Sequence, residues 1–349
     1  MERLNIAVIF GGCSPEYSIS LKSAHAVISA MDKSRFMPLI IGVSSKGDWF
    51  KFDGSLDKIL NDTWCNSNDC TPALFSPCRS EKAVLVFNND RVEKLKIDAA
   101  FPVMHGKNGE DGTVQGLLEL SGIPIIGCGA LCSALCMDKY RAHMLVKSFG
   151  INVPASFLFD KTTDIEKIFE QAEKIHYPLY IKPLRAGSSY GISKVWSAGE
   201  LPDAVKKAFE YDDQAVAEEN IQGYEVGCAL MGNEKIVIGQ VDEIRVPQGF
   251  FSYEEKYTPK SSIIKVPADI SHGKAQEIKE TALCIYRILG CHGFARVDMF
   301  IDMDEKIVFN EVNTIPGFTS RSRFPNMFKA CGITFEKLIS DIIRLGLEA

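Results

Sequence analysis

Short apolar runs separated by glycine-rich turns mark the beginning of the chain. The run LNIAVIFGG, residues 4–12, predicts a buried strand ending in a glycine turn, and SISLKSAHAVISAM, residues 18–31, predicts the helix that follows. Another apolar run at 36–44 predicts a second strand. This order favours a doubly wound sheet with parallel strands. Ligands bind at the carboxyl ends of such strands, where Glu16 follows the first turn, although a solvated loop acid is an equally simple interpretation.

The segment 47–72 interrupts this pattern, because it is polar and irregular, and we expect it to lie on the surface. The apolar pattern resumes at 97–104 and runs into the glycine-rich loop HGKNGEDGTVQG, residues 105–116. A short helix at 114–122 and the apolar run IPIIGCG follow. We therefore place an N-terminal α/β domain at residues 1–128.

Beyond residue 128 the chain mixes helix and strand patterns. The pattern predicts helices at 132–150 and 199–211 and strands at 155–160, 177–184, 193–196 and 214–220. These elements predict a small α+β unit at 129–223. The remainder, 224–349, has the pattern of a hairpin-rich sheet with flanking helices, interrupted by a polar and aromatic loop at 246–262.

Two strand patterns near the C-terminus, ARVDMF and IVFNEVN, are joined by DMDEK. A two-residue turn at Asp304–Glu305 would pair Asp298 with Glu311 and Arg296 with Asn313, all on one face of the hairpin. Two carboxylates and an amide oxygen are ligands that suit Mg²⁺, and Arg296 could stabilise a transferring phosphoryl group or an oxyanion. A plain surface hairpin is less favourable, because facing carboxylates repel each other without a cation.

Two lysines are candidates for binding phosphate. Lys182 ends the run YPLYIKP and is followed by the loop Gly187–Gly191, whose backbone N–H groups could surround a phosphate. The loop matches neither the P-loop nor the Rossmann pattern, so a plain turn explains it equally well. Lys139, in the run MDK, is the second candidate and is equally compatible with a surface lysine.

Composition narrows the class of protein. A length of 349 residues predicts two to three domains. The net charge of -6 argues against a nucleic-acid partner. The apolar runs are shorter than a membrane span, and the N-terminus lacks a signal-peptide pattern, so we expect a cytoplasmic protein with reduced thiols. Among the 11 cysteines, Cys128, Cys132 and Cys136 have helical spacing, which favours buried thiols over a metal cluster because Ala and Leu fill the gaps.

Together, HGKNGEDGTVQG, ARVDMF and FNEVNTIPG, arranged in order around MDK, IKP and GSSYG, resemble the D-alanine–D-alanine ligase family of ATP-grasp enzymes. The resemblance spans nearly the whole chain. It implies an ATP-grasp fold, in which the N-terminal domain is followed by two α+β units that clamp ATP between them. It also implies ATP as a substrate, two Mg²⁺ ions with Mn²⁺ as a substitute, and a homodimer.

The resemblance assigns roles to the matching positions. The ATP-binding residues it implies are Lys139 and Lys182 for phosphates, Glu218 and Ile221 for adenine, Glu225 for ribose, and Phe250 and Lys256. The metal ligands it implies are Asp298, Glu311 and Asn313. The catalytic residues it implies are Glu16, Ser188, Tyr257, Arg296 and Gly317. The substrate-binding residues it implies are His105, Asp242, Phe251, Ser322 and Arg323.

More specifically, Glu16 would pair with the ammonium of the first D-alanine, and Ser322 would bind the carboxylate of the second substrate. Arg296 and the Gly317 backbone N–H would form the oxyanion site. Ser188 and Tyr257 would link to Glu16 and close the 246–262 loop. The implied reaction makes a D-alanyl phosphate from ATP, which the amine of the second substrate then attacks.

The turn after the metal hairpin departs from the biosynthetic pattern. Housekeeping members of the family carry serine followed by leucine, whereas this chain has Ser322-Arg323. This resembles the vancomycin-resistance branch. The loop keeps Lys256-Tyr257, as in the D-serine enzymes, and lacks the histidine of the D-lactate enzymes.

Our hypothesis is that Arg323, with Asp242 and Phe251, shapes the second subsite for D-serine. The alternative is that Arg323 pairs with an acid to order the turn, while Arg321 faces solvent. Within the family, the competing function is D-alanyl-D-alanine synthesis.

Two rival functions come from other classes. A non-catalytic nucleotide-binding module would not need the facing carboxylates. A NAD-dependent dehydrogenase would need G-x-G-x-x-G after the first strand, where this chain has GGCSPE.

Overall fold

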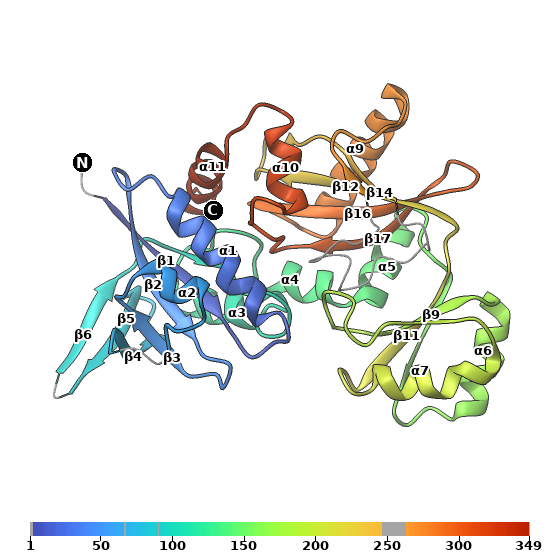
Figure 1. Cartoon of the computed structure of the whole chain (residues 1–349), viewed down its shortest axis with the longest axis horizontal. Helices are drawn as coiled ribbons and strands as arrows, with labels where there is room; N and C mark the ends of the chain where they lie inside the picture. Colours follow the sequence, from blue (N-terminus) through green and yellow to red (C-terminus); the bar gives the residue numbers. More distant parts are fainter. Residues whose placement is uncertain (1–2, 66–67, 90, 246–262, 349) are drawn as a thin grey trace.

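The computed structural model describes residues 3–65, 68–89, 91–245 and 263–348, which form three sheets with flanking helices (Figure 1). The N-terminal part is blue and cyan, the central unit green and yellow, and the C-terminal sheet orange and red. Four residues with expected roles, Phe250, Phe251, Lys256 and Tyr257, lie outside the described residues. Among the described residues, no helix is long and apolar enough to cross a membrane.

The N-terminal sheet has the order β6-β5-β4-β3-β2-β1-β7. Its strands are β1 Leu4–Gly11, β2 Phe36–Val43, β3 Trp49–Phe52, β4 Cys70–Phe75, β5 Ala83–Asn88, β6 Arg91–Lys96 and β7 Ala99–Pro102. Its helices are α1 Tyr17–Ala30, α2 Leu56–Leu60 and α3 Thr113–Leu120. The parallel pairing expected of a doubly wound sheet holds for β1 with β2 and with β7. The strands beyond β2 pair antiparallel.

The prediction that 47–72 is irregular surface is wrong. The segment contains β3, α2 and the start of β4, and Trp64 within it is fully buried. The Trp64 ring packs edge-on against Phe10, with ring centroids 4.8 Å apart. Phe52 and Ile59 of the same segment are buried in this core as well. These few apolar side chains are scattered among polar residues, so they leave no apolar periodicity to detect.

The predicted helix at 132–150 is in fact two helices, α4 Ala130–Met137 and α5 Lys139–Ser148. Asp138 has an extended backbone between them, and its carboxylate accepts a hydrogen bond from the Arg141 backbone N–H at 2.9 Å. This is an N-cap, which begins a new helix. It places Lys139 at the buried start of α5.

The central sheet has the order β10-β9-β11-β8 and is antiparallel. Its strands are β8 Ser156–Asp160, β9 Leu179–Pro183, β10 Ser193–Val195 and β11 Gln214–Glu219. Its helices are α6 Ile165–Ile175, η1 Ala198–Glu200 and α7 Leu201–Ala208. The predicted strands are confirmed here, whereas α6 was not predicted.

The C-terminal sheet has the order β15-β14-β12-β16-β17, with β13 pairing to β12. Its strands are β12 Gly223–Met231, β13 Val237–Ile238, β14 Asp242–Arg245, β15 Ile263–Lys265, β16 Phe294–Asp302 and β17 Ile307–Asn313. Its helices are α9 His272–Ile288, α10 Arg323–Lys329 and α11 Phe335–Leu347. The last helix, α11, returns to lie beside α1 of the N-terminal part (Figure 1).

One apolar cluster joins the first and last parts of the chain. Phe101 on β7 packs edge-on against Phe294 and Phe318, with ring centroids 5.9 Å and 5.6 Å apart. Side chains of α11, among them Leu338 and Ile342, are buried in the same cluster. The N-terminal sheet and the C-terminal sheet are therefore held together by a continuous core, which fixes the walls of the cavity between them.

Candidate active site

The β16–β17 hairpin has the predicted register at the site. Asp298 pairs with Glu311, and Arg296 pairs with Asn313. The turn differs from the prediction, because Ile301 pairs with Ile307 and the loop is one residue longer than two. A bulge between Asp298 and Met299 compensates for that extra residue. Bulges re-aim side chains beside active sites.

The bulged strand is supported from the side. The Nε2 of His143 on α5 lies 2.6 Å from the backbone oxygen of Asn310, the residue that the bulge leaves out of the β16–β17 pairing. His143 is fully buried, and burial lowers the pKa of its imidazole. Its neutral ring therefore donates to the bulge and holds the following residue, Glu311, in place.

Charged groups on the hairpin contact one another closely. The Arg296 guanidinium donates two hydrogen bonds to the Asp298 carboxylate, at 2.8 Å from Nε and 2.7 Å from Nη2. The Asn313 amide donates to the same carboxylate at 2.9 Å. The predicted metal ligands therefore cluster with the predicted oxyanion arginine.

A small cavity lies between the central unit and the C-terminal sheet. Its lining includes the expected ATP-binding residues Lys139, Lys182, Glu218, Ile221 and Glu225, together with Tyr180, Phe300 and Glu311. Lys182 on β9 and Glu218 on β11 form an ion pair. Burial by itself raises the pKa of Glu218, but Lys182, His143 and Lys139 together outweigh burial and the net pKa is lowered. Within the described part of the chain, the buried Oε1 of Glu218 has no hydrogen-bond partner.

A larger cavity of about 380 Å³ adjoins this one and shares Lys139, Ser188 and Glu311 with it. Elements of all three sheets contribute to its walls. The predicted site residues that line it are Glu16, His105, Lys139, Ser188, Arg296, Glu311, Asn313, Gly317, Ser322 and Arg323. Glu16, near the start of the chain, and Arg323, near its end, thus line a single cavity.

Glu16 lies at one end of the larger cavity and joins two parts of the molecule. The Ser188 hydroxyl, from the glycine loop of the central unit, donates a hydrogen bond to the Glu16 carboxylate. A Cβ at Gly106, which has φ +70°, would lie 2.2 Å from Glu16 Oε2. Glycine is required there because both the backbone conformation and the carboxylate exclude a side chain.

His105 is fixed by two hydrogen bonds. Its Nδ1 lies 3.0 Å from the Ile315 backbone oxygen, and its Nε2 lies 3.2 Å from the Ser23 hydroxyl. A carbonyl oxygen only accepts, so Nδ1 carries the proton and Nε2 accepts from Ser23. Burial lowers the pKa of His105 to about 4, and the ring is neutral at neutral pH.

Arg323, at the start of α10, makes ion pairs with three acids. Its Nε and Nη2 donate to the two oxygens of Asp242 at 2.7 Å and 2.8 Å. Its Nη1 donates to Glu225 at 2.6 Å and lies 3.4 Å from Asp298. Burial by itself lowers the pKa of Arg323, but Asp242, Asp298 and Glu225 raise it well above its usual range. The guanidinium therefore connects the cavity wall to Asp298 on the β16–β17 hairpin.

Comparison with known proteins gives the family. Residues 5–128 match the family model "D-ala D-ala ligase N-terminus", and residues 145–344 match "D-ala D-ala ligase C-terminus". The chain belongs to the D-alanine–D-alanine ligase family. Its fold is the ATP-grasp fold, and the family joins D-amino acids at the expense of ATP.

Individual relatives cover the whole chain. The crystal structure of VanG D-Ala:D-Ser ligase from Enterococcus faecalis is 48% identical with a TM-score of 0.91, over 99% of this chain and 100% of that one. The vancomycin B-type resistance protein VanB of Enterococcus faecalis is 44% identical over 100% of both chains. A D-alanine–D-alanine ligase of Caldicellulosiruptor bescii is 41% identical over 100% of this chain and 96% of its own.

The groups that this ligase family requires fit the residues present. Asp298, Glu311 and Asn313 supply the oxygen ligands that a hard divalent cation takes, and Glu311 lies where the two cavities meet. The buried, unpartnered Oε1 of Glu218 is suited to accept a hydrogen bond from the amino group of adenine.

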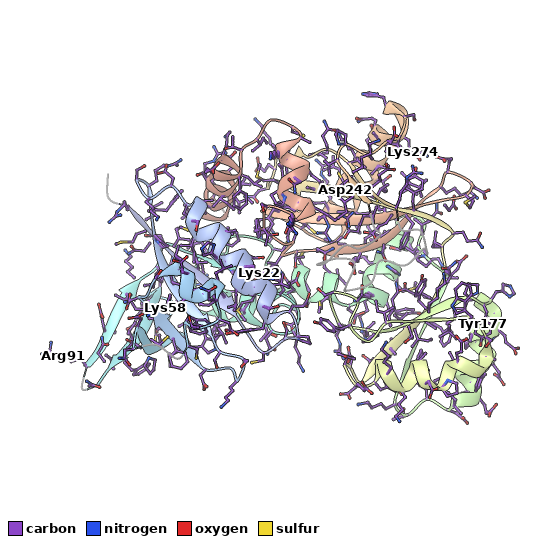
Figure 2. All side chains as sticks on the ribbon, viewed as in Figure 1. Lys22, Lys58, Arg91, Tyr177, Asp242 and Lys274 are labelled. Atoms are coloured by element: carbon purple, nitrogen blue, oxygen red, sulfur yellow. The ribbon has the colours of Figure 1, made fainter. Side chains whose placement is uncertain are left out.

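Three features of the site were not predicted. Glu110 accepts hydrogen bonds from the Gly106 and Ile315 backbone N–H groups, and burial together with Glu16 raises its pKa to about 8. Lys22 on α1 lines the larger cavity. Figure 2 shows Lys22 on the N-terminal helix and Asp242 in the C-terminal sheet. Gly227 is the third, because a Cβ there would lie 2.3 Å from Arg323 Nη2. The sequence places Glu110 in the glycine-rich loop, but nothing in the pattern marks Lys22 or Gly227.

Two residues of the turn before α10 border the larger cavity. Ser322 lines the cavity, and its hydroxyl lies 2.9 Å from that of Thr319. Arg321 is exposed at the cavity rim, in agreement with its predicted solvent-facing position.

Proposed function

We propose that this chain joins D-alanine to D-serine at the expense of ATP. The product, D-alanyl-D-serine, would enter peptidoglycan precursors and so confer vancomycin resistance. The observation that carries the proposal is the buried Arg323–Asp242 pair, in which Arg323 lines the substrate cavity and Asp242 holds its guanidinium from the protein interior. The likeness to VanG D-Ala:D-Ser ligase and to the resistance protein VanB supports it.

In the first half-reaction, a carboxylate oxygen of D-alanine attacks the γ-phosphorus of ATP, and ADP leaves. Lys139 and Lys182 stabilise the phosphate charge, and Glu16 pairs with the ammonium of D-alanine. Two Mg²⁺ ions held by Asp298, Glu311 and Asn313 supply further charge neutralisation when bound. The product is D-alanyl phosphate.

In the second half-reaction, the free amine of D-serine attacks the carbonyl carbon of D-alanyl phosphate, and inorganic phosphate leaves. Arg296 and the Gly317 backbone N–H stabilise the oxyanion that forms on the carbonyl oxygen. Ser322 binds the carboxylate of D-serine. The Ser188–Glu16 contact closes the glycine loop over the cavity and excludes water, which would otherwise hydrolyse the acyl phosphate.

Selectivity for D-serine would depend on buried polar groups of the site that are left unpaired when a substrate without the hydroxyl binds. A site built to hydrogen-bond a hydroxyl rejects its absence by up to ~10⁴-fold, whereas an apolar pocket rejects an added hydroxyl by only ~10²-fold. The three guanidinium nitrogens of Arg323 already contact carboxylates. Arg323 therefore acts on D-serine by holding the polar wall in place.

The second candidate is D-alanine–D-alanine ligation for ordinary wall synthesis. The relative of that name from Caldicellulosiruptor bescii, 41% identical, favours it. Both candidates share the fold and the D-alanyl phosphate chemistry, so they differ only in the second substrate.

The test is ATP-dependent phosphate release by the purified protein with D-alanine alone, with added D-serine and with added D-lactate, with the products identified by mass. Dominant D-alanyl-D-serine supports the proposal. Dominant D-alanyl-D-alanine makes this a biosynthetic ligase, in which the Arg323–Asp242 pair orders the turn. Absence of Mg²⁺-dependent ADP formation would contradict both.

A further inference from the structure

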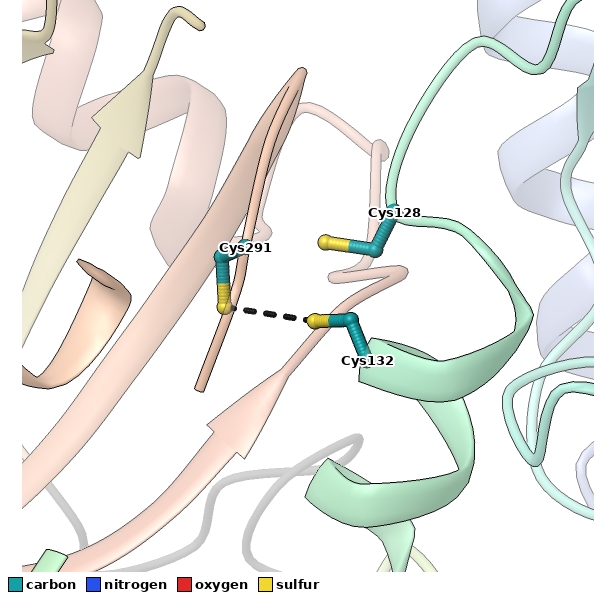
Figure 3. Close-up of side chains that lie close together, drawn as sticks. All are labelled: Cys128, Cys132 and Cys291. Carbon is teal, nitrogen blue, oxygen red and sulfur yellow. Dashed lines mark hydrogen bonds between the residues drawn. The ribbon is translucent and has the colours of Figure 1, made fainter. Parts of the chain in front are cut away.

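Four cysteines that are far apart in the sequence meet in the interior. Cys128 follows the N-terminal sheet, Cys132 and Cys136 lie on α4, and Cys291 lies between α9 and β16. The Sγ atom of Cys132 lies 3.5 Å from that of Cys291 and 3.8 Å from that of Cys136. The sulfurs of Cys128, Cys132 and Cys291 all lie within 4.8 Å of one another (Figure 3).

The sequence favoured buried thiols over a metal cluster because Ala and Leu fill the gaps between Cys128, Cys132 and Cys136. Cys291 comes from a segment 155 or more residues later, and its sulfur completes the cluster from the opposite side. All four side chains are buried. The proposed ligase reaction requires none of them.

The sulfur spacing matches that of a metal-thiolate site. With Zn–S bonds of about 2.3 Å, tetrahedral coordination places neighbouring sulfurs about 3.8 Å apart. The distances of 3.5 Å and 3.8 Å from Cys132 agree with that value. A disulfide would use two of the sulfurs, whereas the arrangement brings together three from separate positions and a fourth beside them.

We propose that Cys128, Cys132 and Cys291 bind a thiophilic divalent cation of the Zn²⁺ class, with Cys136 as the fourth ligand. Soft thiolates select such a cation over Mg²⁺, which prefers oxygen ligands. The site is therefore separate from the oxygen site at Asp298 and Glu311. Cys136 also lines the larger cavity, which provides a route for the cation to reach the cluster.

The bound cation would brace the molecule at a junction. Cys128 and α4 connect the N-terminal sheet to the central unit, while Cys291 precedes β16, which carries Arg296 and Asp298. Coordination across these segments ties the cavity wall to the catalytic strand. Binding would therefore raise the thermal midpoint of unfolding without supplying a catalytic group.

The test is titration of the reduced, metal-free full chain with Co²⁺ in excess Mg²⁺, which occupies the carboxylate site. We expect thiolate-to-cobalt charge-transfer bands and tetrahedral d–d bands that saturate at one Co²⁺ per chain, and that Zn²⁺ then bleaches. Cys132→Ala and Cys291→Ala should lose the bands. Cys228→Ala, which removes a buried cysteine outside the cluster, should keep them.

A measurement on the unmodified chain covers the case in which a variant fails to fold. Alkylation under increasing urea, with and without Zn²⁺, followed by peptide mass spectrometry, should show that Zn²⁺ delays labelling of the four buried cluster cysteines and leaves labelling of the exposed Cys284 unchanged. Absence of cobalt bands, bands that persist in both cluster variants, or equal alkylation with and without Zn²⁺ would each overturn the proposal.

Discussion

At the scale of single residues, Arg323 determines the character of the cavity wall. Its side chain is 8% exposed and contacts three acids, of which Asp242 is fully buried. Leaving Asp242 without its partner is destabilising by about 3–5 kcal/mol, because a buried charge is then uncompensated. A test of selectivity must therefore change both partners.

The double variant Arg323→Leu/Asp242→Asn removes the pair without leaving Asp242 as a buried, unpaired charge. We expect the ratio of kcat/KM for D-serine to that for D-alanine, each as second substrate, to fall by about 10- to 100-fold. Arg323→Lys is the matched control for charge, since lysine keeps the charge but lacks the two-pronged geometry. An unchanged ratio in the double variant would assign the pair to turn ordering.

His105 makes stability depend on acidity. Its pKa is lowered from 6.5 to about 4, so the folded state binds this proton less readily than the unfolded state. The stabilisation is complete above about pH 6.5 and falls by up to about 1.4 kcal/mol per pH unit as pH drops toward 4. Urea unfolding across this range should show a shallower slope for His105→Gln. Identical slopes would mean that His105 is not buried as a neutral ring.

At the scale of elements, the β16–β17 hairpin shows what a sequence pattern can predict. Strand alternation predicted the facing of Asp298 and Glu311, and the structure has that pairing. The predicted turn was one residue too short. The bulge at Asn310 shifts the register by one residue, so the pairs at the site are the predicted ones. A bulge depends on the tertiary contact with His143, which the hairpin's own sequence does not encode.

Other features could not be predicted from the sequence, because they too depend on contacts between residues far apart in the chain. Segment 47–72 is held by the scattered buried side chains Phe52, Ile59 and Trp64. The Arg323–Asp242 contact joins residues 81 positions apart. The association of Arg323 with Asp242 came from family resemblance, while the pairing with Glu225 came from the fold alone. Long-range contacts of this kind leave no local periodicity.

Strand β12 offers a test of the same wall at the level of an element. Gly227 lies between Asp242 on β14 and Asp298 on β16, where a side chain would occupy the space of the Arg323 guanidinium. Gly227→Ala should lower the free energy of unfolding by about 1–3 kcal/mol through overpacking. It should also reduce the preference for D-serine.

The control for this substitution is Gly273→Ala on α9, where an added Cβ meets no atom within 4 Å. Urea unfolding should show little change or a gain of up to about 1 kcal/mol there. Equal effects of the two substitutions would show that Gly227 is not required for the approach of Arg323.

At the scale of the whole molecule, the cavity exists because three sheets meet. The Ser188–Glu16 hydrogen bond joins the central unit to the N-terminal part, and the Phe101 cluster joins that part to the C-terminal sheet. The cavity is therefore closed by contacts that span the chain. In the proposed reaction, this closure would protect the acyl phosphate from water.

Ser188→Ala should loosen this closure and uncouple the two half-reactions. We expect the ratio of phosphate released to dipeptide formed to rise above one, because water intercepts D-alanyl phosphate. Parallel phosphate and dipeptide assays measure the ratio, with the exposed Ser148→Ala as control. A ratio that stays at one would mean that closure does not depend on Ser188.

The central claim is that this member of the family prefers D-serine as its second substrate. The most direct measurement is a competition in which the unmodified protein receives ATP, Mg²⁺ and equal concentrations of D-alanine and D-serine, with the dipeptides quantified by mass. We predict that the amount of D-alanyl-D-serine formed exceeds the amount of D-alanyl-D-alanine at neutral pH. An excess of D-alanyl-D-alanine would contradict it and leave the Arg323–Asp242 pair as a structural feature of the turn.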